Sequence, residues 1–180
     1  HVGDGLLRQS SLCTDPWETP RYLIAVLKEP LSRGGSKGMH EAVDVGHELR
    51  ISEPKNHFQL APGGERHLLL AGGIGVTPIL CMAERLATQG ADFEMHFCTR
   101  SADRTAFRDR IQNSRFAGQV HLHHDDGPAD QKFDIQNRLS RVQKDEHLYV
   151  CGPKGFMDAV LSTARAYGWP EAQIHYEFFA

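Results

Sequence analysis

The sequence lacks both a long apolar run and an excess of positive charge. No apolar stretch approaches the roughly 18 residues that indicate a membrane-spanning helix. The formal net charge is −3, so the chain has no basic footprint of the kind that nucleic acid recognition requires. We therefore expect neither a membrane nor a nucleic acid partner, and we expect a monomer.

Cysteine is scarce and scattered. The four cysteines stand far apart, at Cys13, Cys81, Cys98 and Cys151. This spacing argues against a disulfide framework and favours a reducing compartment. The N-terminus also lacks the pattern of a signal peptide, so the expected location is the cytoplasm.

The segment His121-Leu122-His123-His124 invites a metal assignment that its surroundings do not support. His121 and His123 would share one face of a strand. However, no separated set of carboxylates or cysteines is present to complete a ligand shell. We therefore expect no metal site.

The 180 residues are 40% hydrophobic, which is enough for a core in one large domain or two small ones. The first part, residues 1–62, is irregular. It should contain a strand at 21–27 and another at 47–52. A glycine-rich loop at 32–38 and a short helical piece at 39–43 should separate them. The linker after it is marked by Pro54, Pro62, Gly63 and Gly64.

From residue 66 onward, strands and helices alternate. Five strands are expected, at His67–Ala71, Phe93–Cys98, Gln119–His124, Leu148–Cys151 and Ile174–Phe178. Helical stretches lie near 78–89, 104–113, 134–141 and 154–167. This alternation predicts an α/β domain, residues 63–180, with a parallel sheet and helices on both faces.

The most informative segment, residues 68–78, reads Leu-Leu-Leu-Ala-Gly-Gly-Ile-Gly-Val-Thr-Pro. A short apolar strand meets three glycines, and an amphipathic helix follows, with Thr77 as a candidate cap and Pro78 in the first turn. Glycines let the backbone approach a ligand closely, and a helix N-terminus offers N–H groups and positive potential. The corner suits a pyrophosphate, but its spacing is not G-x-G-x-x-G and a plain tight connection fits equally well.

A second corner of the same kind follows about 75 residues later. The apolar run 147–150 leads into Cys151-Gly152-Pro153 and another helix. Ligands of open α/β sheets bind outside the carboxyl ends of the strands, where both corners would lie. Cys151 alone is most simply a buried small side chain, whereas the ordered pair of corners is much more specific.

These residues resemble a known family. The segments 71–78, 151–153 and Glu177-Phe178-Phe179 are similar to the nicotinamide domain of the ferredoxin reductase superfamily. Within it, the chain most resembles the reductase components of aromatic-ring oxygenases, the phthalate dioxygenase reductase and vanillate demethylase reductase group. Two upstream segments resemble that group's flavin motif, Arg-x-Tyr-Ser-Leu, and its flavin-phosphate segment: Arg-Gln-Ser-Ser-Leu at 8–12, and Arg-Gly-Gly-Ser at 33–36 with Met39-His40.

The resemblance implies a fold, an activity and partners. It implies part of an antiparallel flavin-binding β-barrel in residues 1–62, followed by an NAD-binding parallel-sheet domain in 63–180. The implied protein is a flavin-dependent NADH oxidoreductase of aromatic hydrocarbon catabolism. It would pass electrons through an iron–sulfur centre to a Rieske-type terminal oxygenase or its ferredoxin.

The resemblance also implies site residues. Flavin would be held by Arg8, Ser10, Ser11, Leu12, Arg33, Gly34, Gly35 and Ser36. NADH would be held by Gly72, Gly73, Gly75, Thr77, Arg100, Ser101, Cys151, Gly152, Pro153 and Phe179. The residues at the reacting atoms would be Ser11 near the flavin N5, Cys151 and Glu177 beside the nicotinamide, and Phe179 over the flavin ring.

The residues themselves leave some of these roles open. Arg8 could be a solvated surface arginine, although the planar guanidinium suits bidentate binding of a phosphate or pyrimidine. Residues 34–36 could be a mobile loop, or an anion nest of backbone N–H groups and a hydroxyl flanked by Arg33 and Lys37, which we favour. The resemblance to FMN-using oxygenase reductases favours FMN over FAD, and so does the terminal phosphate site that Arg33 and Ser36 offer without an evident adenine pocket.

The chain departs from the family pattern in two ways. The motif tyrosine that lies against the flavin is Ser10 here, so a stacking contribution of about 0.5–1.5 kcal/mol is absent. By family comparison the chain also opens within the barrel and stops where a plant-type [2Fe–2S] domain normally continues. Its own cysteines cannot supply the C-x4-C-x2-C ligands of such a cluster, which we expect only in that further domain.

Nucleotide choice should be decided where the second parallel strand ends, at residues 98–104. Arg100, Ser101 and Arg104 could hold a 2′-phosphate, whereas Asp103 could accept a hydrogen bond from a free 2′-hydroxyl and repel a phosphate. The family comparison favours NADH over NADPH. The competing interpretations are a nicotinamide-binding module that has lost flavin and catalysis, and an NADP-dependent ferredoxin reductase working in the opposite direction.

Overall fold

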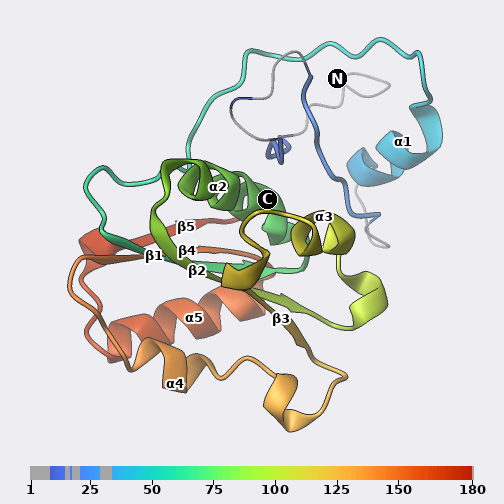
Figure 1. Ribbon diagram of the computed structural model, residues 1–180. Helices are drawn as coiled ribbons and strands as arrows, with labels where there is room; N and C mark the ends of the chain where they lie inside the picture. Colours follow the sequence, from blue (N-terminus) through green and yellow to red (C-terminus); the bar gives the residue numbers. More distant parts are fainter. Residues whose placement is uncertain (1–8, 15–16, 18–20, 29–33, 180) are drawn as a thin grey trace.

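The computed structural model describes residues 9–14, 17, 21–28 and 34–179, and a five-stranded parallel sheet forms its centre (Figure 1). The strands are β1 Arg66–Gly72, β2 Asp92–Thr99, β3 Val120–His124, β4 Glu146–Cys151 and β5 Ile174–Glu177. All neighbouring strands pair in parallel. All five expected strands are confirmed, and the largest shift is at β4, which begins two residues before the expected Leu148.

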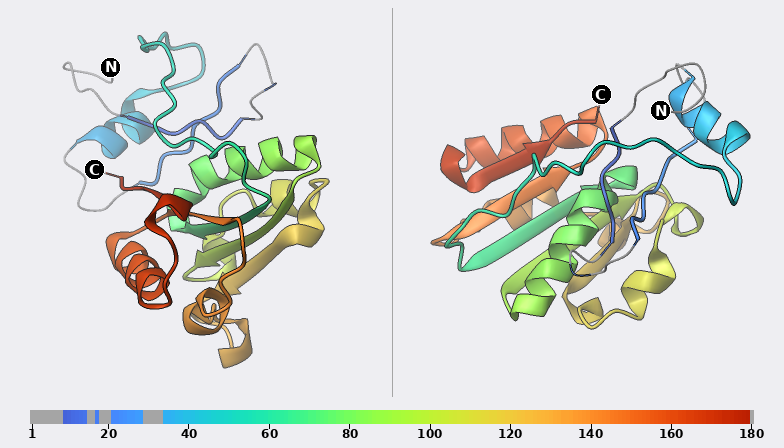
Figure 2. Two further views of the ribbon diagram at one scale, coloured as in Figure 1. Left: turned by 90° about the vertical axis from the view of Figure 1, so that its left-hand side faces the viewer. Right: turned by 90° about the horizontal axis from the view of Figure 1, so that it is seen from above.

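Helices cover both faces of the sheet, as the alternating pattern predicts (Figures 1 and 2). They are α2 Val76–Gln89 and α3 Arg108–Gln112 on one face, and α4 Ile135–Leu139 and α5 Lys154–Ala166 on the other. The α2 face of the sheet packs around buried residues that include Leu69, Ile79 and Phe97. The α5 face packs around residues that include Leu148 and Val160. Each strand therefore presents alternate side chains to one of two apolar layers, which excludes water from both faces.

The helices α3 and α4 are shorter than the sequence pattern predicts. The stretch expected at 104–113 divides into a 3-10 turn, Ala102–Arg104, and then α3. Phe107, at the N-cap of α3, has a positive φ of 58°, which interrupts a continuous helix. At α4, the Asp134 carboxylate accepts from the Asn137 amide and fixes the start of the helix.

The strand order β3-β2-β1-β4-β5 creates a switch point beside the central strand. From β1 the chain moves outward through β2 to β3, and it then returns to the other side of β1 to form β4 and β5. The connections that follow β1 and β4 therefore leave the carboxyl ends of these adjacent strands in opposite directions, toward β2 and toward β5. A crevice for a ligand is expected at this point in open α/β sheets.

The part of the chain before β1 differs from the sequence expectation. Its helix, α1 Gly35–Ala42, begins four residues before the expected 39–43. The strands expected at 21–27 and 47–52 are wrong: among the described residues before β1, only Leu12 and Ile24 form a bridge, which is antiparallel. A strand needs a neighbour for its ladder hydrogen bonds, and a strand-like composition alone does not supply one.

The expected linker crosses the amino-terminal end of the sheet. The Ala61 amide donates to the Tyr149 hydroxyl at 2.9 Å, and the Phe58 and Tyr149 ring centroids lie 6.2 Å apart. Gly64 lies against the rings of His67 and His147, where an added Cβ would come within 2.9 Å and 3.0 Å of ring carbons. The linker is therefore packed onto the sheet by side chains of β1 and β4.

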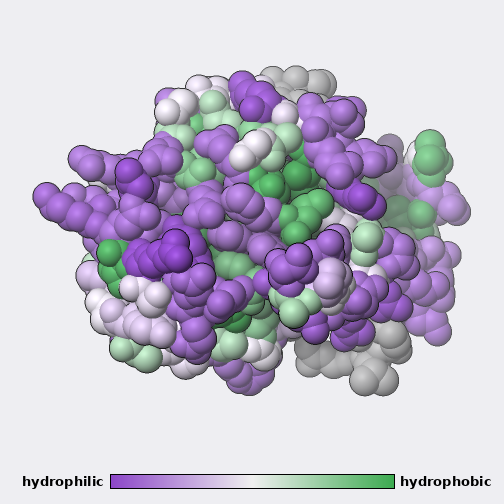
Figure 3. All heavy atoms as spheres, turned by 60° about the horizontal axis from the view of Figure 1, so that its bottom comes forward, coloured by the Kyte–Doolittle hydropathy of each residue, from purple (hydrophilic) through white to green (hydrophobic). Residues whose placement is uncertain are grey.

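The face that carries α4 and α5 is mostly hydrophilic, with apolar side chains in small separated groups (Figure 3). Across the described part of the chain, no helix combines the length and apolar character needed to cross a bilayer.

Candidate functional site

The two glycine corners touch each other through their backbones. A Cβ at Gly75 would lie 2.3 Å from the Cys151 carbonyl oxygen and 2.6 Å from the Gly152 nitrogen. A Cβ at Gly152 would lie 3.0 Å from the Gly72 Cα. Gly75 and Gly152 are therefore required for backbone contact between the corners, whereas a Cβ at Gly72 would lie 2.9 Å from side-chain carbons of Pro153 and Phe156. The pairing that the sequence motifs only suggested is a direct packing contact.

Gly73 has a different reason to be glycine. Its φ is +51°, a conformation that side chains disfavour, and a Cβ there would meet no atom of the described residues within 4 Å. The backbone at this position is therefore open beside the N-terminus of α2. Of the corner glycines, Gly73 alone leaves room for a ligand to approach the chain.

Thr77 lies inside α2 and does not cap it. The N-cap is Gly75, and no side chain caps the helix. The Thr77 hydroxyl donates to the Ile74 carbonyl oxygen at 3.2 Å, and the residue is buried. Thr77 therefore stabilises the turn between strand and helix through this hydrogen bond to the backbone of the turn. Pro78 does lie in the first turn, where its missing N–H costs no hydrogen bond.

The residues expected at the reacting atoms meet at the carboxyl ends of β4 and β5. Cys151 pairs in register with Glu177 on the neighbouring strand. The Ser11 hydroxyl donates to the Glu177 carboxylate, with Oγ and Oε2 3.4 Å apart. A serine of the flavin-like motif thus reaches the strand end beside the glycine corners, although 166 residues separate it from Glu177.

Cys151 is fully buried, and it remains a thiol. Burial, and then the charge of Glu177, raises the pKa of Cys151 to about 12. At neutral pH the side chain carries no negative charge, so it lacks the thiolate that a nucleophile needs. Any part that it plays must be one of shape and contact.

The remaining flavin-motif residues are distributed unevenly. Ser10 is exposed, Leu12 is half-buried, and Phe179 at the chain end is 43% exposed. Arg8 and Arg33 lie outside the described residues. An aromatic side chain at position 10 or 179 would have solvent on at least one side, which is compatible with contact to a planar ligand.

The flavin-phosphate segment is part of a helix. Gly34 is the N-cap of α1 with φ 96°, and Gly35 and Ser36 form the first turn. The Gly38 amide donates to the Gly34 carbonyl oxygen at 2.8 Å. The expected nest of consecutive amides is therefore realised as a helix N-terminus, which also carries positive potential.

The loop expected to select the nucleotide is fixed by threonines that the sequence did not single out. The Thr99 and Thr105 hydroxyls lie 2.9 Å apart, and both donate to the Ser101 carbonyl oxygen, at 3.2 and 3.1 Å. His124 Nδ1 lies 2.9 Å from the same Thr99 hydroxyl. Both threonines are buried, so the loop between them is held rigidly at the end of β2.

Asp103 lies at the tip of this loop and is charged at neutral pH. The Ser101 hydroxyl donates to its carboxylate, and this bond lowers the pKa of Asp103. Arg100 and Arg104 are exposed on the same loop. The structure thus brings together the residues that were expected to choose between a ribose hydroxyl and a phosphate.

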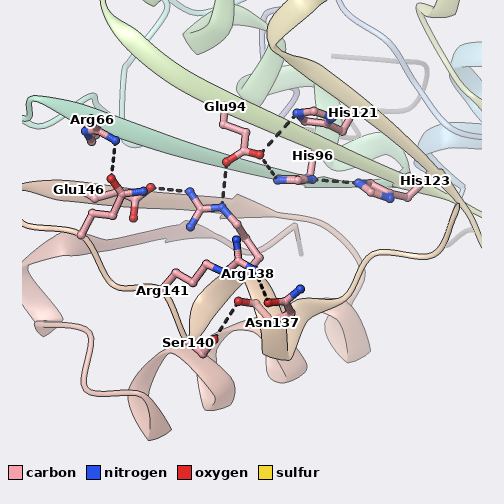
Figure 4. A network of polar contacts seen from close by, with 11 residues as sticks. Arg66, Glu94, His96, His121, His123, Asn137, Arg138, Ser140, Arg141 and Glu146 are labelled. Carbon is pink, nitrogen blue, oxygen red and sulfur yellow. Dashed lines mark hydrogen bonds and ion pairs between the residues drawn. The ribbon is translucent and has the colours of Figure 1, made fainter. Parts of the chain in front are cut away.

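A polar network lies on the opposite, α4 side of the sheet (Figure 4). Glu94 is its centre: its carboxylate lies 3.1 Å from His96 Nε2, 3.5 Å from His121 Nε2 and 2.9 Å from Arg138 Nε. Arg138 also pairs with the buried Glu146 at 2.5 Å. The contact with His96, and then the Arg138 guanidinium, hold the pKa of Glu94 down at about 2. The network attaches α4 to β2 and β4.

The histidines that invited a metal assignment belong to this network. His121 approaches Glu94, and His123 Nε2 lies 2.9 Å from His96 Nδ1. Within the described ranges, no group of three histidine, cysteine or acidic side chains is arranged to hold a metal ion. Sequence reasoning missed Glu94 and Arg138 because nothing local marks charged residues as partners across a sheet.

A known family matches most of the sheet domain. It is described as dimethylamine monooxygenase subunit DmmA-like, N-terminal domain, and it matches residues 51–174. A vanillate O-demethylase oxidoreductase of Pseudomonas putida is 54% identical over 180 residues, covering 100% of this chain and 56% of the relative. A phthalate dioxygenase reductase of Burkholderia cepacia is 35% identical over 179 residues, covering 99% of this chain and 55% of the relative.

A solved structure shares the fold. It is that of phthalate dioxygenase reductase, described as a modular structure for electron transfer from pyridine nucleotides to [2Fe–2S]. It superposes with a TM-score of 0.91 at 35% identity, over 98% of this chain and 55% of the solved chain. These matches confirm the expected likeness and fold class, and the chain spans about half the length of these relatives.

Proposed function

The chain belongs to the family of the DmmA-like N-terminal domain, and proteins similar to it include an oxygenase reductase, so we propose that it is the flavin- and NADH-binding part of such a reductase. The observation that carries the proposal is the contact of Ser11 with Glu177, one strand away from Cys151. It brings a flavin-like motif to the carboxyl ends of β4 and β5, beside the glycine corners. Two cofactors bound there would meet at this edge of the sheet.

The chain would supply orientation and electrostatics to the reaction. When bound, the nicotinamide supplies a hydride and the flavin accepts it and releases electrons singly. The open backbone at Gly73 and the N-terminus of α2 would hold the dinucleotide phosphates. Cys151 would give the nicotinamide a neutral, closely packed wall, and Glu177 would hold the Ser11 hydroxyl toward the flavin. Phe179 would cover the flavin ring until the nicotinamide takes its place.

For the flavin we propose FMN, with FAD as the alternative. The N-terminus of α1, with Ser36 in its first turn, offers a site for a terminal phosphate. Residues 1–62 would form the barrel portion and 63–180 the NAD-binding domain. Mass spectrometry of the flavin released from the full-length protein should detect FMN, and recovery of FAD alone would contradict this choice.

The partners follow from the same proposal. Electrons would pass through a [2Fe–2S] domain outside this chain to a Rieske-type oxygenase or its ferredoxin. The reductase would be a monomer in the cytoplasm. The test uses the purified full-length protein: it should be yellow and should reduce ferricyanide with NADH. A colourless protein with no NADH oxidation would contradict the assignment.

A second candidate function rests on Ser10. This residue is exposed where the family motif has tyrosine, so the chain could bind nicotinamide without holding flavin. Titration with FMN distinguishes the two functions, because a non-catalytic module would bind NADH but not FMN. A Ser10→Tyr variant should bind FMN more tightly, by about two- to twelvefold for a stacking gain of about 0.5–1.5 kcal/mol. An unchanged affinity would mean that the side chain at position 10 does not face the flavin.

A third candidate, an NADP-dependent ferredoxin reductase, rests on Arg100 and Arg104. Both are exposed at the end of β2 and could bind a 2′-phosphate. The charged Asp103 between them opposes this, so we propose NADH as the donor. A tenfold preference for NADPH in kcat/KM would reverse the choice.

A further inference from the structure

The segment Ser11–Cys13 is attached to the sheet domain at a second point besides Glu177. Arg110 on α3 donates from Nη1 to the Cys13 carbonyl oxygen at 2.6 Å. Its other terminal nitrogen, Nη2, donates to Glu84 Oε1 on α2 at 3.2 Å. One guanidinium therefore joins two helices of the sheet domain to the backbone of the flavin-like motif.

The surroundings of Arg110 fix its direction. Its side chain is 28% exposed and that of Glu84 14%, so solvent screens the pair only in part. The guanidinium carbon also lies 5.9 Å from the centre of the Phe107 ring, which belongs to the residue with positive φ at the start of α3. A planar guanidinium held by a carboxylate and a ring has few orientations, so its bond to Cys13 is directional.

The held segment is itself ordered by short contacts. The Cys13 amide donates to the Leu23 carbonyl oxygen at 2.9 Å, and Leu12 bridges Ile24. Cys13 is fully buried. A displacement of the Cys13 carbonyl would therefore move Ser11, two residues away, relative to Glu177.

We propose that Arg110 is a positioning residue: through the Cys13 carbonyl it holds the Ser11–Cys13 segment, and the flavin with it, at the distance from the nicotinamide that hydride transfer needs. The inference rests on the proposed function and adds a residue that acts through the backbone of the flavin-like motif. Reacting atoms must come within about 3–3.5 Å, and a misplacement of about 1 Å costs about a hundredfold in rate. Arg110 also follows the nucleotide loop, five residues after Thr105, so it connects the two cofactor-binding parts.

The test compares variants of the full-length, flavin-loaded protein in anaerobic stopped-flow reduction by NADH. Arg110→Gln should lower the limiting rate of flavin reduction at least tenfold, with the Kd for NADH changed less than threefold. Arg110→Lys should recover part of the rate, because one ammonium can donate to Cys13 but lacks the rigid fork. Arg108→Gln, which removes an exposed arginine from the same helix, should match the wild type. Equal rates for Arg110→Gln and Arg108→Gln would overturn the proposal.

Hydrogen exchange gives a readout that does not depend on catalysis. The Cys13 amide should exchange about tenfold faster in Arg110→Gln than in Arg108→Gln, and unchanged exchange overturns the positioning role. A wild type that oxidises no NADH would contradict the proposed function instead, so the two failures are distinguishable. If Arg110→Gln does not fold, Glu84→Gln serves in its place, since it leaves the guanidinium present but loosely held. It should accelerate the same amide by a smaller factor.

Discussion

The Ser11 hydroxyl donates to the Glu177 carboxylate, so the start and the end of this chain meet at one edge of the sheet. The Oγ–Oε2 distance of 3.4 Å is long for an O–H···O bond, which leaves room for either group to move toward a ligand. The contact is also where the two proposed cofactor-binding parts meet. Several expected results depend on it.

Ser11→Ala and Glu177→Gln should each slow flavin reduction by NADH about tenfold, equivalent to about 1.4 kcal/mol. The two residues act through one hydrogen bond, so the double variant should lose little more than either single variant. Stopped-flow reduction of all four proteins measures the coupling. Losses that multiply, to about a hundredfold in the double variant, would mean that the residues act separately.

Cys151→Ala should lower the rate of flavin reduction and leave NADH binding nearly unchanged. The buried neutral thiol would shape the wall against the nicotinamide, whereas the dinucleotide is anchored elsewhere. Cys81→Ala, inside α2, is the cysteine control. If Cys151→Ala reduces the flavin at the wild-type rate, Cys151 contributes only packing.

Phe179→Ala should have a different effect: NADH should bind faster or more tightly, because the ring that competes with the nicotinamide is gone.

Gly75→Ala should destabilise the fold by at least about 1–3 kcal/mol, the usual cost of overpacking. Its Cβ would lie 2.3 Å from the Cys151 carbonyl oxygen, and backbone atoms of the central strands have little freedom to move. Urea unfolding at pH 7.5 measures the loss. Gly155→Ala in α5 is the control: its Cβ would meet nothing within 4 Å, and alanine favours a helix, so it should be neutral or stabilising. Equal midpoints for the two variants would show that the corners are not in contact.

Asp103→Asn should raise kcat/KM for NADPH about tenfold and change that for NADH less. The Ser101 hydroxyl keeps the Asp103 pKa low, so at neutral pH the variant removes a full negative charge between Arg100 and Arg104. Asp109→Asn removes an equal charge from the neighbouring helix and should leave the NADPH/NADH ratio unchanged. A ratio that moves equally in both variants would indicate a general charge effect and not recognition at the loop.

Stability should fall as the pH falls from 7.5 to 5.5. Burial, and then the nearby His147, lowers the pKa of His67, and burial also lowers the pKa of His175. Above the ordinary value of about 6.5, both the folded and unfolded forms of these side chains are neutral and stability is complete. Below it, the unfolded chain binds protons more readily than the folded one, so the free energy of unfolding decreases.

The measurement is urea unfolding at several pH values, with His67→Phe as the variant. This variant removes the titrating group but keeps a ring beside Tyr149, so it should flatten the pH dependence by on the order of 1 kcal/mol. His57→Gln, on the exposed linker, should follow the wild-type curve. If the free energy of unfolding of His67→Phe falls with pH as steeply as that of the wild type, titratable groups other than His67 cause the loss of stability.

Local patterns were enough to predict the sheet domain. Apolar runs of strand length and helical periodicity are properties of neighbouring residues, so five strands and helices on both faces could be predicted without knowledge of contacts. The same reasoning failed at 21–27 and 47–52, where the composition was strand-like but the described residues supply no ladder with a neighbouring strand. Pairing is a relation between distant segments, and local composition does not report it.

The candidate site divides in the same way. The glycine corners were predicted because turns and helix starts leave a local signature. The packing of β1 against β4 decided the role of each glycine. Gly75 and Gly152 let two backbones touch, and a Cβ at Gly73 would meet none of the described residues. Thr77 was mistaken for a cap because its sequence position suited one, and only the three-dimensional turn shows its hydroxyl bound to Ile74.

The sequence by itself determined the parallel α/β architecture and the two corners, because hydrophobic periodicity and glycine freedom act over a few residues. Only the tertiary structure decided that Ser11 meets Glu177 and that Arg110 holds Cys13, across 166 and 97 residues of chain. Such contacts depend on the path of the backbone between them. A hydroxyl or guanidinium finds its acceptor only after the core has packed and fixed both ends in space.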